Sequence, residues 1–211
     1  MTEAPINRLE RRKQRTRMAL VKAAQSMIAA GKLNVPVLEI TQAADVGMGS
    51  FYNHFDSKEQ LFEAAVADVL DSHGAVLDQL TAAIEDPAAV FACSFRLTGR
   101  FFRERPQESR ILLANAGALL SADRGLAPRA LRDINAAVTA GRFHVEDPER
   151  SLAVAAGALL GLGYLLQSQP DRDAVATADA VTEDVLRLFG MSAEDARQIC
   201  ALPLPDMAFQ E

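Results

Sequence analysis

Apolar residues recur along most of this chain at intervals of three and four positions, the spacing that places them on one face of an α-helix. Short segments containing Gly, Pro, Asn or Asp separate these stripes. No convincing run alternates apolar and polar residues as a half-buried strand does. The pattern therefore predicts an all-α protein. In the first third of the chain it predicts helices over 9–30, 37–44, 48–55 and 58–83.

The rest of the chain shows the same helical pattern, with prolines at the joints between predicted helices. The first four predicted elements end with one long helix, and a larger helical body follows. We therefore expect a small N-terminal domain over 1–56 and a larger domain over 57–211. In the larger domain further helices are predicted over 88–105, 107–120, 128–140, 148–168, 174–189 and 192–200.

Composition places the chain among ordinary globular proteins, because 49% of its 211 residues are hydrophobic and 24% are charged. Cys93 and Cys200 lie far apart, which favours two buried, reduced thiols in a cytoplasmic protein. The polar, basic N-terminus does not resemble a secretory signal. The apolar run 152–166 is shorter than the roughly 18 to 20 residues that span a bilayer. It predicts a buried helix and no membrane association.

The charges are unevenly distributed along the chain. The net charge of −6 argues against binding to nucleic acid. However, residues 8–32 contain eight basic residues and one acidic residue, whereas residues 61–211 contain 13 basic and 22 acidic residues. A basic N-terminal domain on an acidic body is one interpretation, and an ordinary solvated charged face is the other.

The segment "GMGSFYNHFDSKEQLF", residues 47–62, favours the first interpretation. Two short helices joined by a tight turn at 45–47 form a helix-turn-helix, whose second helix enters the major groove of DNA. Gly47 and Gly49 permit close approach to DNA. Phe51 and Phe55 are predicted to face inward. The hydrogen-bonding side chains suited to phosphates or bases are Ser50, Tyr52, Asn53, His54 and Lys58.

Residues 16–66 resemble the DNA-binding domain of the TetR family of transcriptional repressors. The similarity lies in "TRMALVKAA", "VLEITQAADVGMGSFYNHF" and "SKEQLF". The stretch "GRFHVEDPERSLAVAAGALLG" is similar to the family's stretch leading into its dimerisation helices. This resemblance implies an N-terminal helix-turn-helix domain and a helical domain that binds a small-molecule effector and dimerises.

The resemblance also implies which residues contact operator DNA. Tyr52 and Lys58 are expected to bind the DNA backbone, and Met48, Ser50 and Asn53 to read bases. The chain departs from the usual pattern at Asp45, Gly47 and Pro36, which puts single contacts in doubt. His54 is equally well explained as a capping or core histidine. The complete set of implied DNA contacts is Arg15, Thr16, Arg17, Met48, Gly49, Ser50, Tyr52, Asn53, His54 and Lys58.

Dimerisation has support in the sequence as well. The helix over 151–166 is apolar on nearly all faces, and a second apolar stripe follows in the helix over 174–189. Two such helices per chain would form a four-helix interface with a second copy, and a homodimer suits a near-palindromic operator. The alternative is that they are intramolecular core helices. The stripe of the second helix comprises Val181, Val185, Leu188 and Phe189.

An effector site is harder to place from the sequence. Aromatic residues and arginines are interleaved on the helix over 88–105, and isolated polar residues interrupt later apolar runs. The phenylalanines are better explained as core, and the arginines would neutralise an acidic ligand or face water. A mostly apolar effector is predicted. The candidate ligand contacts are Phe91, Phe95, Arg96, Phe102, Asn115 and Tyr164.

No enzyme motif appears: "VGMGSFY" lacks the third glycine and the preceding strand of a dinucleotide site. His73 and His144 are isolated and predicted to be exposed, so neither a metal nor a cofactor is expected. The sequence thus predicts a repressor that a small-molecule effector releases from its operator. Two alternatives remain open: a DNA-binding regulator without such an effector, and an all-α small-molecule-binding protein or enzyme.

Overall fold

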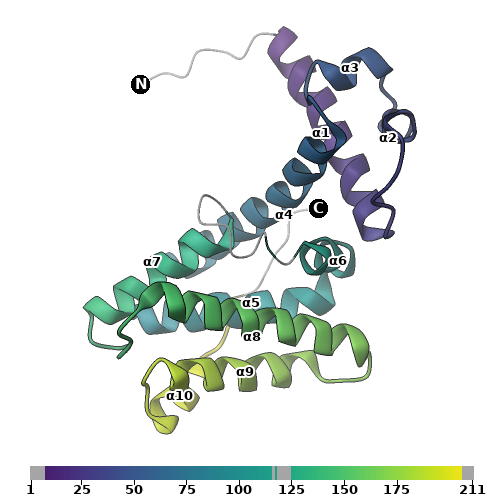
Figure 1. Ribbon diagram of the computed structural model, residues 1–211. Helices are drawn as coiled ribbons and strands as arrows, with labels where there is room; N and C mark the ends of the chain where they lie inside the picture. The colour runs from purple at the N-terminus through teal and green to yellow at the C-terminus, as the bar shows by residue number, and fades with distance from the viewer. Residues whose placement is uncertain (1–7, 116, 118–124, 206–211) are drawn as a thin grey trace. The chain divides into compact units, whose positions relative to one another are not determined.

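A computed structural model describes residues 8–115, 117 and 125–205 of the chain. Helices dominate these described residues, which contain no β-strand, as the sequence predicts (Figure 1). The chain divides into two compact units, residues 1–69 and 70–211. The boundary falls inside the helix α4 (Lys58–Thr81), so this one helix contributes to both units.

The first unit is built from α1 (Arg8–Ala29), α2 (Val37–Ala43), α3 (Met48–Tyr52) and the first part of α4. Their apolar faces meet in one small core, and Phe51 and Phe55 point into it as predicted, with 0% and 3% of their surfaces exposed. The other large buried side chains of this core are Leu20, Val21, Met27, Ile28, Ile40 and Leu61.

Left-handed residues follow the first two helices of this unit. Gly31 has a φ of +73°, and Asp45 occupies the same region with a φ of +53°. At Asp45 the turn is closed by two backbone bonds, from Val46 N to Thr41 O at 3.0 Å and from Asp45 N to Gln42 O at 3.1 Å. Asp therefore fills a position that favours Gly, because its short polar side chain tolerates this conformation.

Helix α3 is shorter than predicted: it ends at Tyr52 instead of Phe55, with Asn53 as its C-cap. Helix α4 begins as predicted after Ser57, whose hydroxyl accepts a hydrogen bond from the backbone N of Gln60 at 3.1 Å. The Gln60 side chain in turn accepts from the backbone N of Asp56 at 2.7 Å. These two bonds fix the start of α4.

The first half of α4 is attached to α1 by two side-chain hydrogen bonds. The Gln25 amide donates to the Ala65 carbonyl at 3.1 Å and to the Asp68 carboxylate at 2.9 Å. The unit boundary falls at 69/70, inside α4, whereas the sequence-based division at 56/57 marks the point where this helix begins.

The second unit surrounds α5 (Pro87–Glu104), which contacts every later helix of the chain. In Figure 1, α5, α8 and α9 lie side by side. The rings of Phe91, Phe143 and Phe189 meet at its centre, with centroids 5.2 to 5.7 Å apart. The remaining helices are α6 (Pro106–Ala114), α7 (Leu126–Thr139), α8 (Pro148–Ser168), α9 (Ala174–Leu188) and α10 (Ala193–Cys200).

One predicted helix extends too far. The apolar run over 107–120 predicts a single helix, but α6 ends at Ala114 and Asn115 is its C-cap. The Asn115 side-chain amide donates to the carbonyl of Ile111 at 2.9 Å, which satisfies one of the terminal carbonyls of the helix. Residues 116 and 118–120 of the predicted helix lie outside the described residues.

Helix α8 is the one helix in the described part of the chain that is long and apolar enough to cross a membrane. It packs against α5, α6, α7 and α9, and seven of its residues are buried, as predicted for a core helix. The predicted stripe on α9 is only partly available to a second copy. Val185 and Phe189 are buried in the chain's own core, each 1% exposed, whereas Leu188 is 68% exposed.

Candidate DNA-binding surface and effector cavity

Four of the ten predicted DNA contacts, Met48, Gly49, Ser50 and Tyr52, lie on α3. Phe51 holds the helix against the core, so its neighbours project outward: Met48 is 42% and Tyr52 60% exposed. A Cβ atom added at Gly47 or Gly49 would meet nothing within 4 Å, so this end of the helix is slim and open. Asn53 is exposed, and Ser50 and His54 are half-buried. We call the ten predicted DNA contacts the recognition surface: Arg15, Thr16, Arg17, Met48, Gly49, Ser50, Tyr52, Asn53, His54 and Lys58.

Helix α1 brings positive charge beside the end of α3. The Arg17 guanidinium lies 5.0 Å from the centroid of the Phe55 ring. Burial, and then the charges of Lys13 and Arg17, lower the pKa of His54. Arg15 is exposed, and the half-buried Thr16 donates to the Arg12 carbonyl at 3.1 Å. Cationic and neutral hydrogen-bonding groups therefore lie together here, as phosphate binding requires.

Lys58 is the first residue of α4, where a cation is unfavourable next to the helix dipole. Its Nζ atom donates to the Asn34 side chain at 3.3 Å. This bond positions the ammonium group with respect to the loop that precedes α2. The contact with Asn34 could not be predicted from local pattern, because 24 positions separate the two residues.

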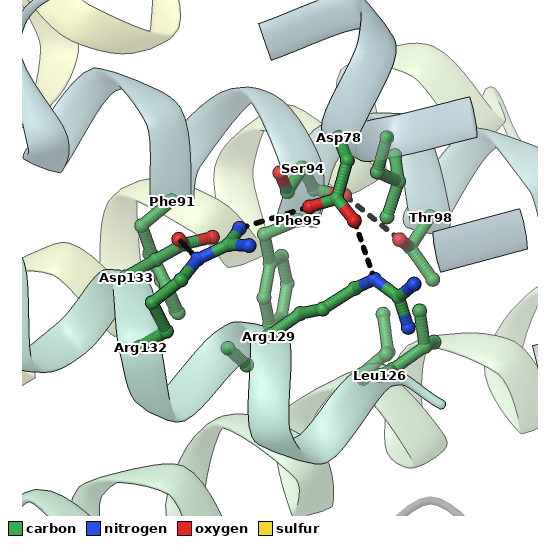
Figure 2. Close-up of a pocket in the computed structure, with 12 residues that line it drawn as sticks. Asp78, Phe91, Ser94, Phe95, Thr98, Leu126, Arg129, Arg132 and Asp133 are labelled. Atoms are coloured by element: carbon green, nitrogen blue, oxygen red, sulfur yellow. Dashed lines mark hydrogen bonds and ion pairs between the residues drawn. The ribbon is translucent and has the colours of Figure 1, made fainter. Parts of the chain in front are cut away.

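A cavity of about 70 Å³ lies in the second unit, among α4, α5, α7 and α8. The surface that it presents is almost entirely apolar. Its apolar residues are Leu77, Phe91, Phe95, Leu126, Ala130 and Leu159. Its polar residues are Asp78, Ser94, Thr98, Arg129, Arg132 and Asp133 (Figure 2).

Four charged side chains of this cavity form one ion cluster. The carboxylate of Asp78 on α4 faces two guanidinium groups of α7, with Arg129 Nε at 2.7 Å and Arg132 NH2 at 3.0 Å (Figure 2). Arg132 Nε also donates to Asp133 at 2.9 Å. Burial raises the pKa of Asp133, although the hydrogen bond and the charge of Arg132 act to lower it. Burial also raises the pKa of Asp78, but the hydrogen bonds that Asp78 accepts from both arginines lower this pKa overall.

His73 lies behind the cavity and contacts it through Thr98. The Thr98 hydroxyl donates to the Ser94 carbonyl at 2.7 Å, so His73 Nε2, 3.0 Å from that hydroxyl, is the donor. His73 Nδ1 is then an acceptor, and it is buried with no hydrogen-bond donor among the described residues. The prediction that His73 is exposed is wrong: it is 3% exposed. It shares a helix face with the buried Leu70 and Leu77, a spacing that would have revealed it.

Two family models match this chain. Residues 19–65 match the model described as bacterial regulatory proteins, tetR family, and residues 86–201 match the model described as a tetracyclin repressor-like C-terminal domain. The chain belongs to the TetR family. It is thus a transcriptional regulator with a DNA-binding and a ligand-binding domain, which confirms the predicted fold and class of function. Members of this family are regulators of transcription and not enzymes.

Solved structures agree with this assignment. RolR without ligand is 33% identical, covering 90% of this chain and 98% of that chain, with a TM-score of 0.76. RolR in complex with resorcinol is 31% identical, covering 94% and 99%, with a TM-score of 0.67. A putative tetR family regulator from Shewanella sp. PV-4, 15% identical over 82% of this chain and 97% of that chain, has the same fold with a TM-score of 0.70. A comparison with curated protein sequences gives no match.

Two of the six ligand contacts predicted for this TetR-family chain, Phe91 and Phe95, line the cavity. The other four do not. Arg96 does not face water, because it is 5% exposed, and its guanidinium group already pairs with the Asp179 carboxylate at 2.8 Å. Phe102 is buried in the core beside α8.

The two polar candidates of the sequence bond to backbone carbonyls. Asn115 donates to Ile111 as described above, and Tyr164, 50% exposed, donates its hydroxyl to Leu113 at 2.8 Å. The charged groups that the sequence did not single out are Asp78 and the α7 segment "RALRD". Within the described residues, no group of His, Cys, Asp or Glu side chains is suited to hold a metal ion.

The buried His73 is expected to make the stability of this regulator depend on pH. Burial lowers the pKa of His73 from 6.5 to about 4, so the unfolded chain takes up the proton first as the pH falls. The contribution of neutral His73 to the free energy of unfolding is complete above pH 6.5. It is lost progressively towards pH 4, by up to about 3 kcal/mol. Urea unfolding between pH 7.5 and 4.5 measures it. His73→Gln should flatten this dependence and the exposed His144→Gln should not, whereas equal pH dependence in all three proteins contradicts the assignment.

Proposed function

We propose that this regulator represses transcription in the cytoplasm by binding a near-palindromic operator as a homodimer, and that a small-molecule effector in the cavity releases it. One observation carries the proposal: α4, whose first residue Lys58 belongs to the recognition surface, lines the cavity with Leu77 and Asp78. An effector that shifts α4 at the cavity therefore acts on an element of the DNA-binding unit. The expected mechanism is a shift of population towards a state that no longer fits two successive half-sites.

The relationship to RolR supports a small effector. RolR, solved with resorcinol, is 31% identical over 94% of this chain. We propose that the effector of this chain is likewise a small, mostly apolar molecule, which agrees with the apolar surface of the cavity.

On the DNA side, each residue of the recognition surface has a proposed role. Met48, Ser50 and Asn53 read bases, because they belong to or directly follow the helix that enters the groove. The slim N-terminal end of α3 at Gly49 lets the backbone approach. The residues proposed to bind phosphates are Arg15, Thr16, Arg17, Tyr52, His54 and Lys58.

The experiment that tests the proposal is DNA binding to the region just upstream of the regulator's own gene. Affinity is measured at two salt concentrations, with random DNA as competitor, and then with added resorcinol. Specific, salt-steep binding that resorcinol weakens supports the whole proposal. Specific binding that neither resorcinol nor any other compound of a small-molecule screen weakens leaves a DNA-binding regulator without such an effector. No binding at low salt contradicts the assignment of the recognition surface.

Asn53→Ala is expected to relax sequence specificity. Loss of a base contact should reduce the ratio of operator to random-DNA affinity by about 10-fold, equivalent to ~1.4 kcal/mol. Lys58→Ala is the matched comparison, because loss of a phosphate contact weakens binding to both DNAs and lowers the salt slope by about 1. Competition titrations measure the ratio of operator to random-DNA affinity for both variants. If the Asn53 variant loses affinity equally for operator and random DNA, Asn53 does not read bases.

The proposed dimer interface includes the exposed face of α8. Val154 is 44% and Tyr164 50% exposed there, and a Cβ at Gly157 or Gly161 would meet nothing within 4 Å. Gly161→Arg therefore fits the single chain but obstructs a second copy, and should yield a folded monomer. Sedimentation and circular dichroism measure this, with Asn135→Arg on the exposed side of α7 as control. If the Gly161→Arg protein remains dimeric, the dimer interface does not include this face of α8.

A further inference from the structure

We propose that the cavity selects an uncharged ligand of about one six-membered ring that carries a hydroxyl group, and discriminates against carboxylates and ammonium compounds of the same size. This inference rests on the proposed function, because it specifies the chemistry of the proposed effector site.

The size of the cavity limits the ligand to a single ring. Its volume is about 70 Å³, against ~150 Å³ for an engineered apolar cavity that takes up benzene. Even one ring requires the walls to move slightly. Phe91 and Phe95 offer aromatic surface, with ring centroids 6.0 Å apart, and Leu77 and Leu159 supply aliphatic surface. Fused-ring or long-chain ligands would need several side chains of the core to be displaced.

The ion cluster excludes a charged ligand because its charges already balance. It contains two carboxylates, Asp78 and Asp133, and two guanidinium groups, and each is ion-paired within the cluster. A ligand carboxylate or ammonium group would therefore enter a mostly apolar cavity without an unpaired counter-charge. Removing an ion from water without such a partner is unfavourable by several kcal/mol.

The same cluster favours a hydroxyl group on the ligand. A carboxylate has about four lone-pair sites and no donor of its own, and each Asp78 oxygen accepts one hydrogen bond from an arginine. A ligand hydroxyl can donate to a remaining site without adding charge. It would then share the Asp78 carboxylate with the two arginines that join α7 to α4, which links ligand binding to the position of α4.

The first test compares probes of similar size on the full-length protein by calorimetry at neutral pH. The probes are phenol and benzyl alcohol, which are neutral, benzoate, which is anionic, and benzylamine, which is cationic. We expect the neutral probes to bind at least 10-fold more tightly than the charged ones. Equal or tighter binding of benzoate or benzylamine overturns the proposal, as does a failure to bind any of the four.

Two variants with opposite charge changes make the test directional. Asp78→Asn leaves the cluster with an excess positive charge, so the affinity of benzoate relative to benzyl alcohol should rise at least 10-fold. Arg132→Gln leaves an excess negative charge and should favour benzylamine by a similar factor. The Arg132 side chain is 56% exposed, so this arm remains informative if Asp78→Asn fails to fold. Arg150→Gln, in an exposed pair with Glu146 at 3.8 Å, is the control, and unchanged ratios in both cluster variants overturn the proposal.

A cavity-filling variant locates the bound probe. Ala130→Leu places a larger side chain in the cavity and should weaken phenol binding at least 10-fold, whereas Ala136→Leu, on the exposed side of the same helix, should not. Equal phenol affinity in both variants overturns the assignment of the cavity. DNA binding of the same samples separates the two proposals. A protein that binds its operator but no neutral probe contradicts only the proposed class of ligand. A protein that binds phenol but no DNA contradicts only the proposed DNA-binding function.

Discussion

Phe51→Ala is expected to destabilise the first unit by about 3 to 5 kcal/mol, while Tyr52→Ala at the next position leaves its stability nearly unchanged. Phe51 is 0% exposed and its ring contacts the rings of Tyr52 and Phe55, with centroids 5.1 and 6.1 Å away. Truncation at this position leaves a cavity in the small core formed by α1, α2, α3 and the first part of α4. Tyr52 is 60% exposed and loses little buried surface.

Hydrogen exchange on the full-length protein measures this difference unit by unit. In Phe51→Ala, amides of α1 to α3 should exchange faster while those of α5 to α9 keep their protection. Tyr52→Ala should retain wild-type protection and lose affinity for operator and random DNA alike, because it removes a proposed phosphate contact. Phe51→Leu, which keeps most of the volume, should restore most of the protection. Protection in α1 to α3 that survives Phe51→Ala would show that Phe51 is not the centre of this core.

The first unit was predictable because its structure depends on local signals. The left-handed turn at Asp45, the stop at Gly31 and the N-cap at Ser57 each involve residues within five positions of one another. Phe51 and Phe55 are separated by one helical turn, so periodicity alone placed both in the core. The end of α3 was misplaced by three residues, as is usual where a short helix frays into its cap.

The effector cavity was less predictable because its polar groups come from distant segments. Asp78 and Arg129 are 51 positions apart, and nothing in the local pattern of α4 or α7 indicates that they meet. The buried His73 illustrates the same limitation: its helical spacing indicates burial, but its partner Thr98 lies 25 positions away. Apolar periodicity identified Phe91 and Phe95, since every core-facing residue of α5 obeys it, and could not separate cavity walls from solid core.

The arginines of α5 are another case in which distance along the chain concealed the structure. Arg96 donates to Asp179 through Nε at 2.8 Å and NH2 at 3.2 Å, and its NH1 donates to the Leu202 carbonyl at 2.8 Å. Arg100 also reaches Asp179, at 3.3 Å. One carboxylate of α9 therefore pairs with two guanidinium groups of α5, and Arg96 also donates to the segment that follows α10.

Asp179→Ala is consequently expected to lower the free energy of unfolding by about 3 kcal/mol, because it leaves the buried Arg96 without a counter-charge. Asp184→Ala is the matched control on the same helix, since Asp184 pairs with Arg187 at 3.5 Å and both side chains are more than half exposed. Its effect should be below about 0.5 kcal/mol. Urea unfolding followed by circular dichroism measures both variants, and equal destabilisation by the two contradicts the role given to Asp179.

The double variant Arg96→Met and Asp179→Leu separates two explanations of that loss. If the destabilisation comes from an uncompensated buried charge, replacing both partners by apolar side chains should recover most of it, because a buried ion pair contributes little beyond an apolar contact of the same shape. If Arg96 acts mainly by holding the Leu202 carbonyl, the double variant should remain as unstable as Asp179→Ala and expose residues 201–205 to proteolysis. We expect recovery of stability together with faster proteolysis of that segment, since the carbonyl bond is lost while the charge penalty disappears.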